Sequence, residues 1–391
     1  MTAVRYSSEL TAALNDVLGA DIQRPVALHE PEITDEEERL VSDCLKSGWV
    51  SSVGSYVGQF ESDLCSYTNA KYAVAMASGT SALQLALHAI GVANGDEVII
   101  PALSFVATAN AVSHCGAIPH FVDSTESDLG IDAQQLRRYL SAITQHRDGA
   151  TINRLTGRRL GAVVPVHVLG LAANIDEICA VALEFGLPVV EDAAEAVGTT
   201  IGSRHAGTFG VAGMLSFNGN KIITTGNGGA ILTDDEALAH RLRHISSTAK
   251  KAHAWRFDHD EIGWNYRLPN LNAALGCAQL RRLNSLLERK RLLHERYQAR
   301  LTGNNSLKLL SQRQGTTSNY WLNAVSIPGL SIEEREQVLG DCHAQGFLCR
   351  PMWTLLSNLP MYRSSPRSNL ETAHRIECET VCLPSGPRLA R

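Results

Sequence analysis

VVEDAAEAVG, residues 189–198, joins a short apolar strand to acidic and small residues. The later stretch MLSFNGNKIITTGNGG, residues 214–229, likewise leads from an apolar strand into Lys221 and a group of glycines. In an open α/β sheet, ligands bind beyond the carboxyl ends of the strands. The two stretches therefore predict a sheet that carries Asp192 and Lys221 at one edge. Taken alone, an acid after a strand could equally be a loop cap or a solvated end.

Outward from these stretches, short apolar segments alternate with helical ones from about residue 31 to residue 233. This alternation predicts a mostly parallel sheet covered by helices, an α/β fold. We expect seven strands, at Ala73–Ala77, Glu97–Ile100, His120–Val122, Gly161–Pro165, Pro188–Val190, Met214–Phe217 and Gly229–Leu232.

The C-terminal part has a different pattern. Apolar residues at helical spacing predict one long amphipathic helix over Leu271–Leu301, which we expect to bridge two domains. The segment Leu307–Arg391 is typical of a small α+β domain. Its signals are strands at Trp321–Ile327 and Gly346–Cys349 and a helix at Ile332–Gln345.

A chain of 391 residues is long enough for more than one core. We divide it into an N-terminal extension (1–27), a large domain (28–260) and a small C-terminal domain that includes the bridging helix (261–391). Within the extension, Ser8–Leu18 fits either an amphipathic helix or a frayed tail.

Composition excludes several classes of protein. The 35 Lys and Arg against 40 Asp and Glu give a net charge of −5, without the basic excess that drives nucleic-acid binding. No apolar run reaches the roughly 18 residues of a membrane span, and we find no signal segment. The 9 cysteines contain no CxxC pair and the 14 histidines no HExxH, so we expect free thiols in the cytoplasm and no metal.

Asp192 and Lys221 together have a specific chemical use. A lysine amine can form a Schiff base with the aldehyde of pyridoxal phosphate, and a carboxylate beside the pyridine nitrogen keeps that nitrogen protonated. Neither GxGxxG nor GxxxxGK[ST] occurs in the sequence, which disfavours dinucleotide and P-loop binding. The sequence therefore predicts a pyridoxal-phosphate site.

No Lys or Arg occurs between Lys71 and Arg137. Any phosphate bound by this part of the chain must therefore be held by neutral groups. Gly79 and Thr80 lie in a turn of small residues before an apolar helix, where backbone amides favour an anion. A simple helix cap is the alternative interpretation. Phe105, just beyond a strand, could stack on a planar ring or belong to the core.

Five motifs in this order resemble the DegT/DnrJ/EryC1/StrS family of fold-type I, pyridoxal-phosphate-dependent sugar aminotransferases. They read SGTSAL, PALSFVATANAV, EDAAEAVG, SFNGNKIITTGNGG and GWNYRLPNLNAALG. The segments LHEPEI, SGWVSSVG, NGNKIITTG and CRPMWTLLSNLPMY are similar to the branch that makes the 4-amino sugar precursor of legionaminic acid.

The resemblance implies a role for each matching residue. Lys221 would be the Schiff-base lysine, Asp192 the partner of the pyridine nitrogen and Glu195 a neighbour of the ring hydroxyl. The other cofactor contacts would be Phe105 on the ring face, Gly79, Thr80 and Ser216 on the phosphate, and Asn265 on the phosphate of the other subunit. Many relatives have His where this chain has Asn218, Glu where it has Asn227, and a His in the turn near Ser357, so substrate contacts inferred from those relatives do not transfer.

The implied enzyme is a cytoplasmic homodimer with shared active sites. It would take an amine from an amino acid, glutamate by resemblance, through the pyridoxamine form of the cofactor, and pass it to a 4-keto nucleotide sugar. The alternatives are a 3-keto sugar aminotransferase and a non-catalytic, cofactor-binding homologue.

The sequence leaves alternative roles for His167 and for four arginines. His167 follows a strand and could touch the cofactor or be a satisfied core histidine. The arginines on the long helix are interpreted as a solvated face, with contact to a nucleotide diphosphate as the lesser alternative: Arg281, Arg282, Arg289 and Arg291.

Overall fold

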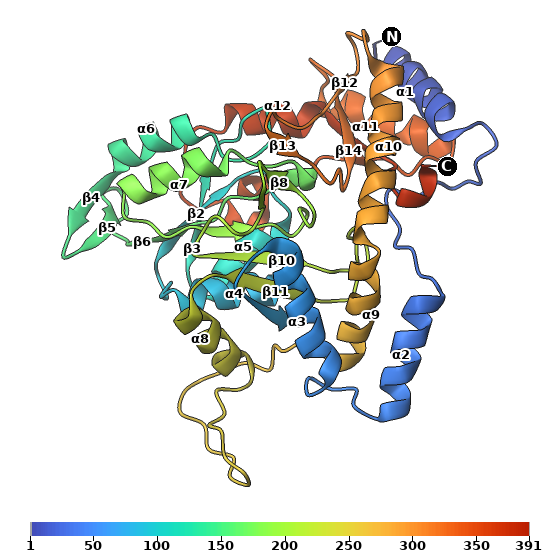
Figure 1. Ribbon diagram of the computed structural model, residues 1–391. Helices are drawn as coiled ribbons and strands as arrows, with labels where there is room; N and C mark the ends of the chain where they lie inside the picture. Colours follow the sequence, from blue (N-terminus) through green and yellow to red (C-terminus); the bar gives the residue numbers. More distant parts are fainter. Residues whose placement is uncertain (1, 391) are drawn as a thin grey trace.

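The computed structural model describes residues 2–390. Its larger core is built on a seven-stranded sheet (Figure 1). A four-stranded part, β1-β11-β10-β7, and a three-stranded part, β6-β2-β3, are joined by the parallel bridges Val163–Val189 and Val166–Asp192. β11 runs antiparallel to β1 and β10, and the other pairings are parallel.

All seven expected strands are present, each close to its expected position, which confirms the α/β fold with a mostly parallel sheet. The strands are β1 (Tyr72–Met76), β2 (Glu97–Pro101), β3 (Ile118–Val122), β6 (Leu160–Val163), β7 (Val190–Asp192), β10 (Ala212–Ser216) and β11 (Gly229–Thr233).

Helices cover both faces of this sheet (Figure 1), as a mostly parallel sheet requires. Ile99 and Val122 on one face pack against α6 and α7, whereas α3, α4 and α5 contribute to the cluster on the other face. The helices of this core are α2 (Asp35–Ser47), α3 (Ser55–Thr68), α4 (Gly79–Ala89), α5 (Val106–His114), α6 (Ala133–Ile143), α7 (Ile175–Glu184) and α8 (Glu236–Ser246). Five short strands decorate it: β4 (Thr144–Arg147), β5 (Ala150–Asn153), β8 (Thr200–Ile201), β9 (Arg204–His205) and β13 (Thr316–Thr317).

A second core surrounds a smaller sheet of order β12-β14-β16-β15. Its N-terminal helix is docked, not frayed, because Leu10 and Leu14 are fully buried in one cluster with Tyr297 and Phe347. The elements here are α1 (Thr2–Leu18), α10 (Leu283–Leu301), α11 (Ile332–Ala344), α12 (Glu371–Glu379), β12 (Lys308–Leu309), β14 (Asn323–Ser326), β15 (Arg350–Pro351) and β16 (Thr380–Leu383). The strand expected at Gly346–Cys349 is wrong in position, because pairing with β16 begins only at Arg350.

The helix expected over Leu271–Leu301 consists of two helices in one column (Figure 1). Arg282 separates α9 (Asn270–Arg281) from α10, and its φ of −96° and ψ of −4° interrupt the regular helix. The apolar spacing misses the break because it continues through both halves. α9 packs on α2 and α3, and α10 packs on α1, so the column connects the two cores.

Three arginines of this column bind acids in the first turn of α2 or in the segment just before it, so they are not simply a solvated face. Arg281 pairs with Glu36 at 2.7 Å and Arg289 with Glu32 at 2.9 Å. Arg282 binds both Glu32 and Glu37. These pairs tie the start of the larger core to the column.

The division of the chain at residues 27 and 260 stays a prediction. Within residues 2–390, none of the helices combines the length and the apolar character that crossing a membrane requires. All 9 cysteines are free thiols.

Candidate active site

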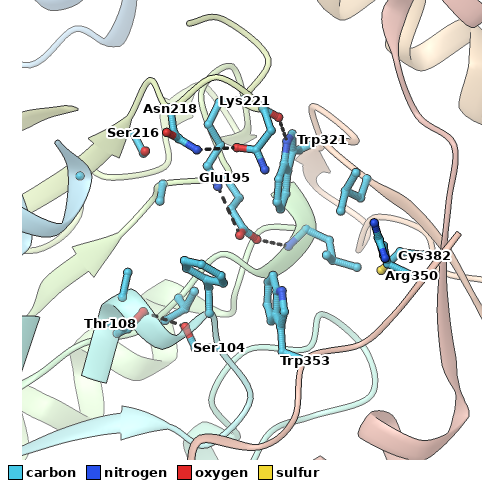
Figure 2. A pocket seen from close by; sticks show the side chains of 18 of the residues that line it. Ser104, Thr108, Glu195, Ser216, Asn218, Lys221, Trp321, Arg350, Trp353 and Cys382 are labelled. Carbon is cyan, nitrogen blue, oxygen red and sulfur yellow. Dashed lines mark hydrogen bonds and ion pairs between the residues drawn. The ribbon is translucent and has the colours of Figure 1, made fainter. Parts of the chain in front are cut away.

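A cavity of about 810 Å³ lies between the two cores, beyond the carboxyl ends of β7 and β10 (Figure 2). Seven of the eight predicted site residues line it: Gly79, Thr80, Phe105, Asp192, Glu195, Ser216 and Lys221. The eighth, Asn265, is exposed, pairs with Ser247 in an isolated bridge and does not line the cavity of this chain. The fold therefore brings together predicted site residues that lie up to 142 positions apart in the sequence, from Gly79 to Lys221.

Asp192 forms the floor of the cavity at the end of β7. Its carboxylate accepts hydrogen bonds from the Thr108 hydroxyl at 2.7 Å and the Ala194 amide at 3.1 Å. Thr108, on α5, also bonds Ser104 just before this helix at 2.7 Å, so the two hydroxyls together orient the acid (Figure 2). Burial raises the pKa of Asp192, and these bonds together with Lys221 oppose the rise. A cation at this carboxylate would stabilise its ionised form.

Lys221 and Glu195 meet above this floor. The Lys221 Nζ lies 3.4 Å from Glu195 Oε1, and the lysine side chain is only 13% exposed. The other carboxylate oxygen of Glu195 accepts a bond of 2.8 Å from the Leu169 amide. Burial raises the pKa of Glu195 to about 7, with the lysine acting against the increase. The pair therefore places a proton acceptor and a proton donor together near neutral pH.

The N-terminus of α4 opens into the same cavity. Ser78 caps the helix by accepting a bond of 3.1 Å from the Ser81 amide, and the first amides of a helix have no partner within it. No acid occurs in the first turn. Gly79 packs so closely on β10 that an added Cβ would lie 2.9 Å from the Ser216 Cβ. This turn offers neutral donors to an anion.

Two aromatic side chains face each other at the side of the cavity. Phe105, at the start of α5, is 53% exposed, and its ring meets Trp353 edge to face with the centroids 6.2 Å apart. A large ring left this open has a free face toward the cavity. His167, in contrast, is fully buried and bonds Glu191 at 3.0 Å without lining the cavity, which matches the core-histidine interpretation.

Sequence reasoning missed most of the wall supplied by the second core. Trp321, from the segment before β14, covers Lys221, and Arg350 from β15 lies near Cys382 (Figure 2). Arg335 on α11 is 7% exposed and binds Glu336 at 3.0 Å. His29 also lines the cavity, and neither of its ring nitrogens has a hydrogen-bond partner among the described residues. His29 and Arg350 lie in the quoted segments LHEPEI and CRPMWTLLSNLPMY, but nothing in those segments showed that the two side chains line the site.

The comparison with protein families decides the identity. The family described as DegT/DnrJ/EryC1/StrS aminotransferase matches residues 31–391. The chain belongs to this aminotransferase family. It is a pyridoxal-phosphate-dependent sugar aminotransferase. This confirms the family, the cofactor and the enzyme class that the sequence predicts.

Individual members of the DegT/DnrJ/EryC1/StrS family match along most of the chain. The putative pyridoxal phosphate-dependent aminotransferase EpsN of Bacillus subtilis is 33% identical over 94% of this chain and 92% of its own length. GDP-perosamine synthase of Caulobacter vibrioides is 35% identical over 94% of each chain. The putative sugar aminotransferase Spr1654 of Streptococcus pneumoniae, solved in its PLP form, superimposes with a TM-score of 0.82 at 25% identity over 93% of both chains.

The cavity of this aminotransferase fits pyridoxal phosphate. Asp192 is a buried carboxylate whose ionised form needs a positive partner, which a protonated pyridine supplies. The neutral turn at α4 suits the phosphate, and Lys221 lines the same cavity. The residues present therefore fit the cofactor in charge and donor type.

Proposed function

We propose that this enzyme transfers an amino group from L-glutamate to the keto carbon of a 4-keto-6-deoxy nucleotide sugar. The observation that carries the proposal is the convergence of Lys221 and Asp192, from the ends of neighbouring strands, in a cavity of about 810 Å³. Protein sites for small ligands typically have volumes of about 300–1,000 Å³, so this one has room for a cofactor and part of a sugar substrate.

The cofactor supplies an aldehyde that accepts an amine and a ring that withdraws electrons. In our assignment Lys221 would hold the aldehyde at rest and, once free, would move a proton to or from the reacting carbon. Positioned proton transfer of this kind contributes about 10²–10⁴-fold in rate. Asp192 would keep the pyridine nitrogen protonated, and Glu195, which contacts the free lysine amine, would neighbour the ring hydroxyl.

The remaining assigned residues bind and orient. Gly79 and Thr80 offer backbone amides to the phosphate, and Ser216 offers its hydroxyl from β10. Phe105 would lie against one face of the pyridine ring, where its exposed side chain is consistent with stacking. Because none of these groups is cationic, the phosphate is held by hydrogen bonds and the helix dipole.

A nucleotide-linked substrate is supported by the relatives named GDP-perosamine synthase, a name that specifies a nucleotide sugar. The spore coat polysaccharide biosynthesis protein SpsC of Bacillus subtilis, 40% identical over 68% of this chain, points to surface polysaccharide as the pathway. We assign the finer branch, the 4-amino precursor of legionaminic acid, from four sequence segments alone, such as LHEPEI. We place the reaction in the cytoplasm, in keeping with 9 free thiols.

We also propose that the working enzyme is a homodimer in which Asn265 reaches the phosphate in the partner's cavity. The segment before Asn265 protrudes below α8 (Figure 1). It exposes Trp255, Phe257 and Ile262 by 79%, 76% and 85%. Large apolar side chains left this open are typical of a surface that another chain covers. Asn265 would then complete a neutral donor set that this chain lacks alone.

The proposed reaction is tested by following the visible absorption of the bound cofactor in the purified protein. Glutamate should change the absorption, and a keto-sugar acceptor should restore it. A panel of UDP-, GDP- and dTDP-linked 3-keto and 4-keto sugars, analysed by mass spectrometry and NMR, identifies the nucleotide and the aminated carbon. Amination at C3 alone would contradict the 4-keto assignment, and a protein that never takes up cofactor would contradict the whole proposal.

The shared site is tested by mixing Lys221→Ala with Asn265→Ala protein. If Asn265 acts across the interface, a mixed dimer contains one intact site and one doubly altered site, so activity returns on mixing. Subunit exchange is verified by mass labels. Exchange without recovered activity would leave Asn265 as the cap of a turn.

A further inference from the structure

The indole ring of Trp321 lies directly over the amine of Lys221. The Nζ is 3.9 Å from the ring centroid, and on its other side it meets Glu195 at 3.4 Å. Trp321 is only 5% exposed and lines the cavity (Figure 2). A cation held over an aromatic face in such a desolvated place is stabilised more than one at the surface.

The ring is fixed from several directions. Its Nε1 donates a hydrogen bond of 2.8 Å to the carbonyl of Asn220, the residue just before Lys221. The Trp321 amide donates to Asn319 Oδ1 at 2.8 Å, and the Asn319 amide group donates to the Glu195 carbonyl at 2.8 Å. Trp321 is therefore tied directly to the backbone next to Lys221 and, through Asn319, to the backbone of Glu195.

A buried lysine on α10 completes this attachment. The Lys290 Nζ donates to the Trp321 carbonyl at 2.7 Å and also to the Ser385 carbonyl. Lys290 is fully buried, and burial lowers its pKa well below the ordinary value. Its two carbonyl bonds connect the column and the end of β16 to the segment that carries the indole.

We infer that Trp321 is a positioning residue for Lys221: its ring, with Glu195, holds the lysine amine whenever that amine is not attached to the cofactor. This inference rests on the proposed role of Lys221. A mobile lysine side chain loses rotamer entropy each time it must return to the same geometry. A fixed aromatic face beside a carboxylate defines one place for the free amine and keeps it within reach of the cavity.

The test compares two replacements of similar volume in the full-length chain freed of cofactor. Trp321→Phe keeps an aromatic face, whereas Trp321→Met covers the lysine without one. Each protein is treated with cyanate, which carbamylates free amines, and the rate at Lys221 is followed by peptide mass spectrometry. The exposed Lys71 in the same sample serves as the reference.

We expect Trp321→Met to raise the Lys221 rate relative to Lys71 by roughly 3- to 30-fold, the equivalent of about 0.7–2 kcal/mol of cation–π stabilisation. Trp321→Phe should stay much closer to the parent. Trp353→Leu opens the same cavity away from Lys221 and should change the rate by less than about 2-fold. Equal rates in the parent and the Met variant, or equal rates in Met and Phe, would overturn the positioning role.

A second measurement separates this inference from the proposed function. Borohydride reduction of the cofactor-loaded protein, followed by peptide mapping, identifies the lysine that carries the cofactor. Attachment to another lysine would refute the role of Lys221, whatever the cyanate rates are. Attachment to Lys221 with unchanged cyanate rates would refute only the role of Trp321.

Discussion

Glu191 and Asp192 follow one another on β7 and point to opposite faces of the sheet. Glu191 is fully buried and accepts bonds from His167, Gly207, Phe209 and Gly210 at 2.5–3.0 Å. Burial alone would raise the pKa of Glu191, but these bonds, that of His167 first, hold it below its ordinary value. Asp192 has two such bonds and a raised pKa.

The difference separates two uses of a buried acid. Glu191 has all its hydrogen-bonding capacity satisfied by the protein, which stabilises the turn at residues 207–210. The carboxylate of Asp192 accepts fewer hydrogen bonds from the protein and can accept more from the cavity, which makes it less favourable to bury in the folded protein. The number and direction of hydrogen bonds, not burial, therefore distinguish Glu191 from the acid that we propose as the cofactor's partner, Asp192.

The largest expected effect is on the cavity side. Lys221→Ala should abolish both half-reactions, a loss of more than about 10⁴-fold, because no other group supplies the attaching amine or the proton transfer. The unfolding free energy should change little. Half-reaction rates with glutamate and with the keto sugar, together with circular dichroism, check both parts. Exchange of amine near the parent rate would show that chemistry does not reside on this face.

The next effect is on the opposite face. Glu191→Ala should lower the unfolding free energy by about 3–5 kcal/mol, because it leaves His167 and three amides buried without an acceptor. Urea unfolding of the cofactor-free protein measures the loss. Asp192→Ala is the matched control and should cost far less. Equal losses in the two variants would remove the distinction between the acids.

Asp192→Asn sharpens the same comparison through activity. A hydrogen bond to a charged partner contributes about 1.5–3 kcal/mol, so turnover should fall roughly 10- to 150-fold while the protein still binds cofactor. Single-turnover rates at saturating glutamate provide the measurement. Parent-like turnover would leave Asp192 as a structural cap of the loop after β7.

Glu195 provides a more gradual effect, a dependence of stability on pH. Its pKa is raised from 4.5 to about 7, so between these values the folded protein keeps a proton that the unfolded chain releases. The unfolding free energy therefore falls as pH rises through this window, by up to about 1.4 kcal/mol per pH unit.

Glu195→Gln should flatten this slope in the cofactor-free protein, and unfolding at several pH values from 5 to 8 measures it. Glu336→Gln is the control, since Glu336 lines the same cavity with its side chain 60% exposed. A slope equally steep in Glu195→Gln would assign the titration to another group.

How far the sequence predicts this molecule depends on how local the signal is. The seven strands are predictable because each is a short apolar run with its own boundaries. Lys221 and Asp192 are predictable because strand ends gather at one edge. Trp321 and Arg350 do not follow strand ends of the large sheet, and their place in the cavity depends on how the second core packs on the first. The break at Arg282 also has no signal in the sequence, because the helical spacing of apolar residues continues through it.

The docked helix α1 has a consequence for anyone who trims this protein to its recognisable part. The family match begins at residue 31, yet the second core is closed by Leu10 and Leu14, which lie before that point. A chain that starts at Pro31 would retain every assigned catalytic side chain and expose Tyr297 and Phe347 to water. Such a fragment would expose an apolar surface and would be prone to self-association. The segment before the family match therefore covers apolar residues of the second core, and we expect its removal to favour aggregation.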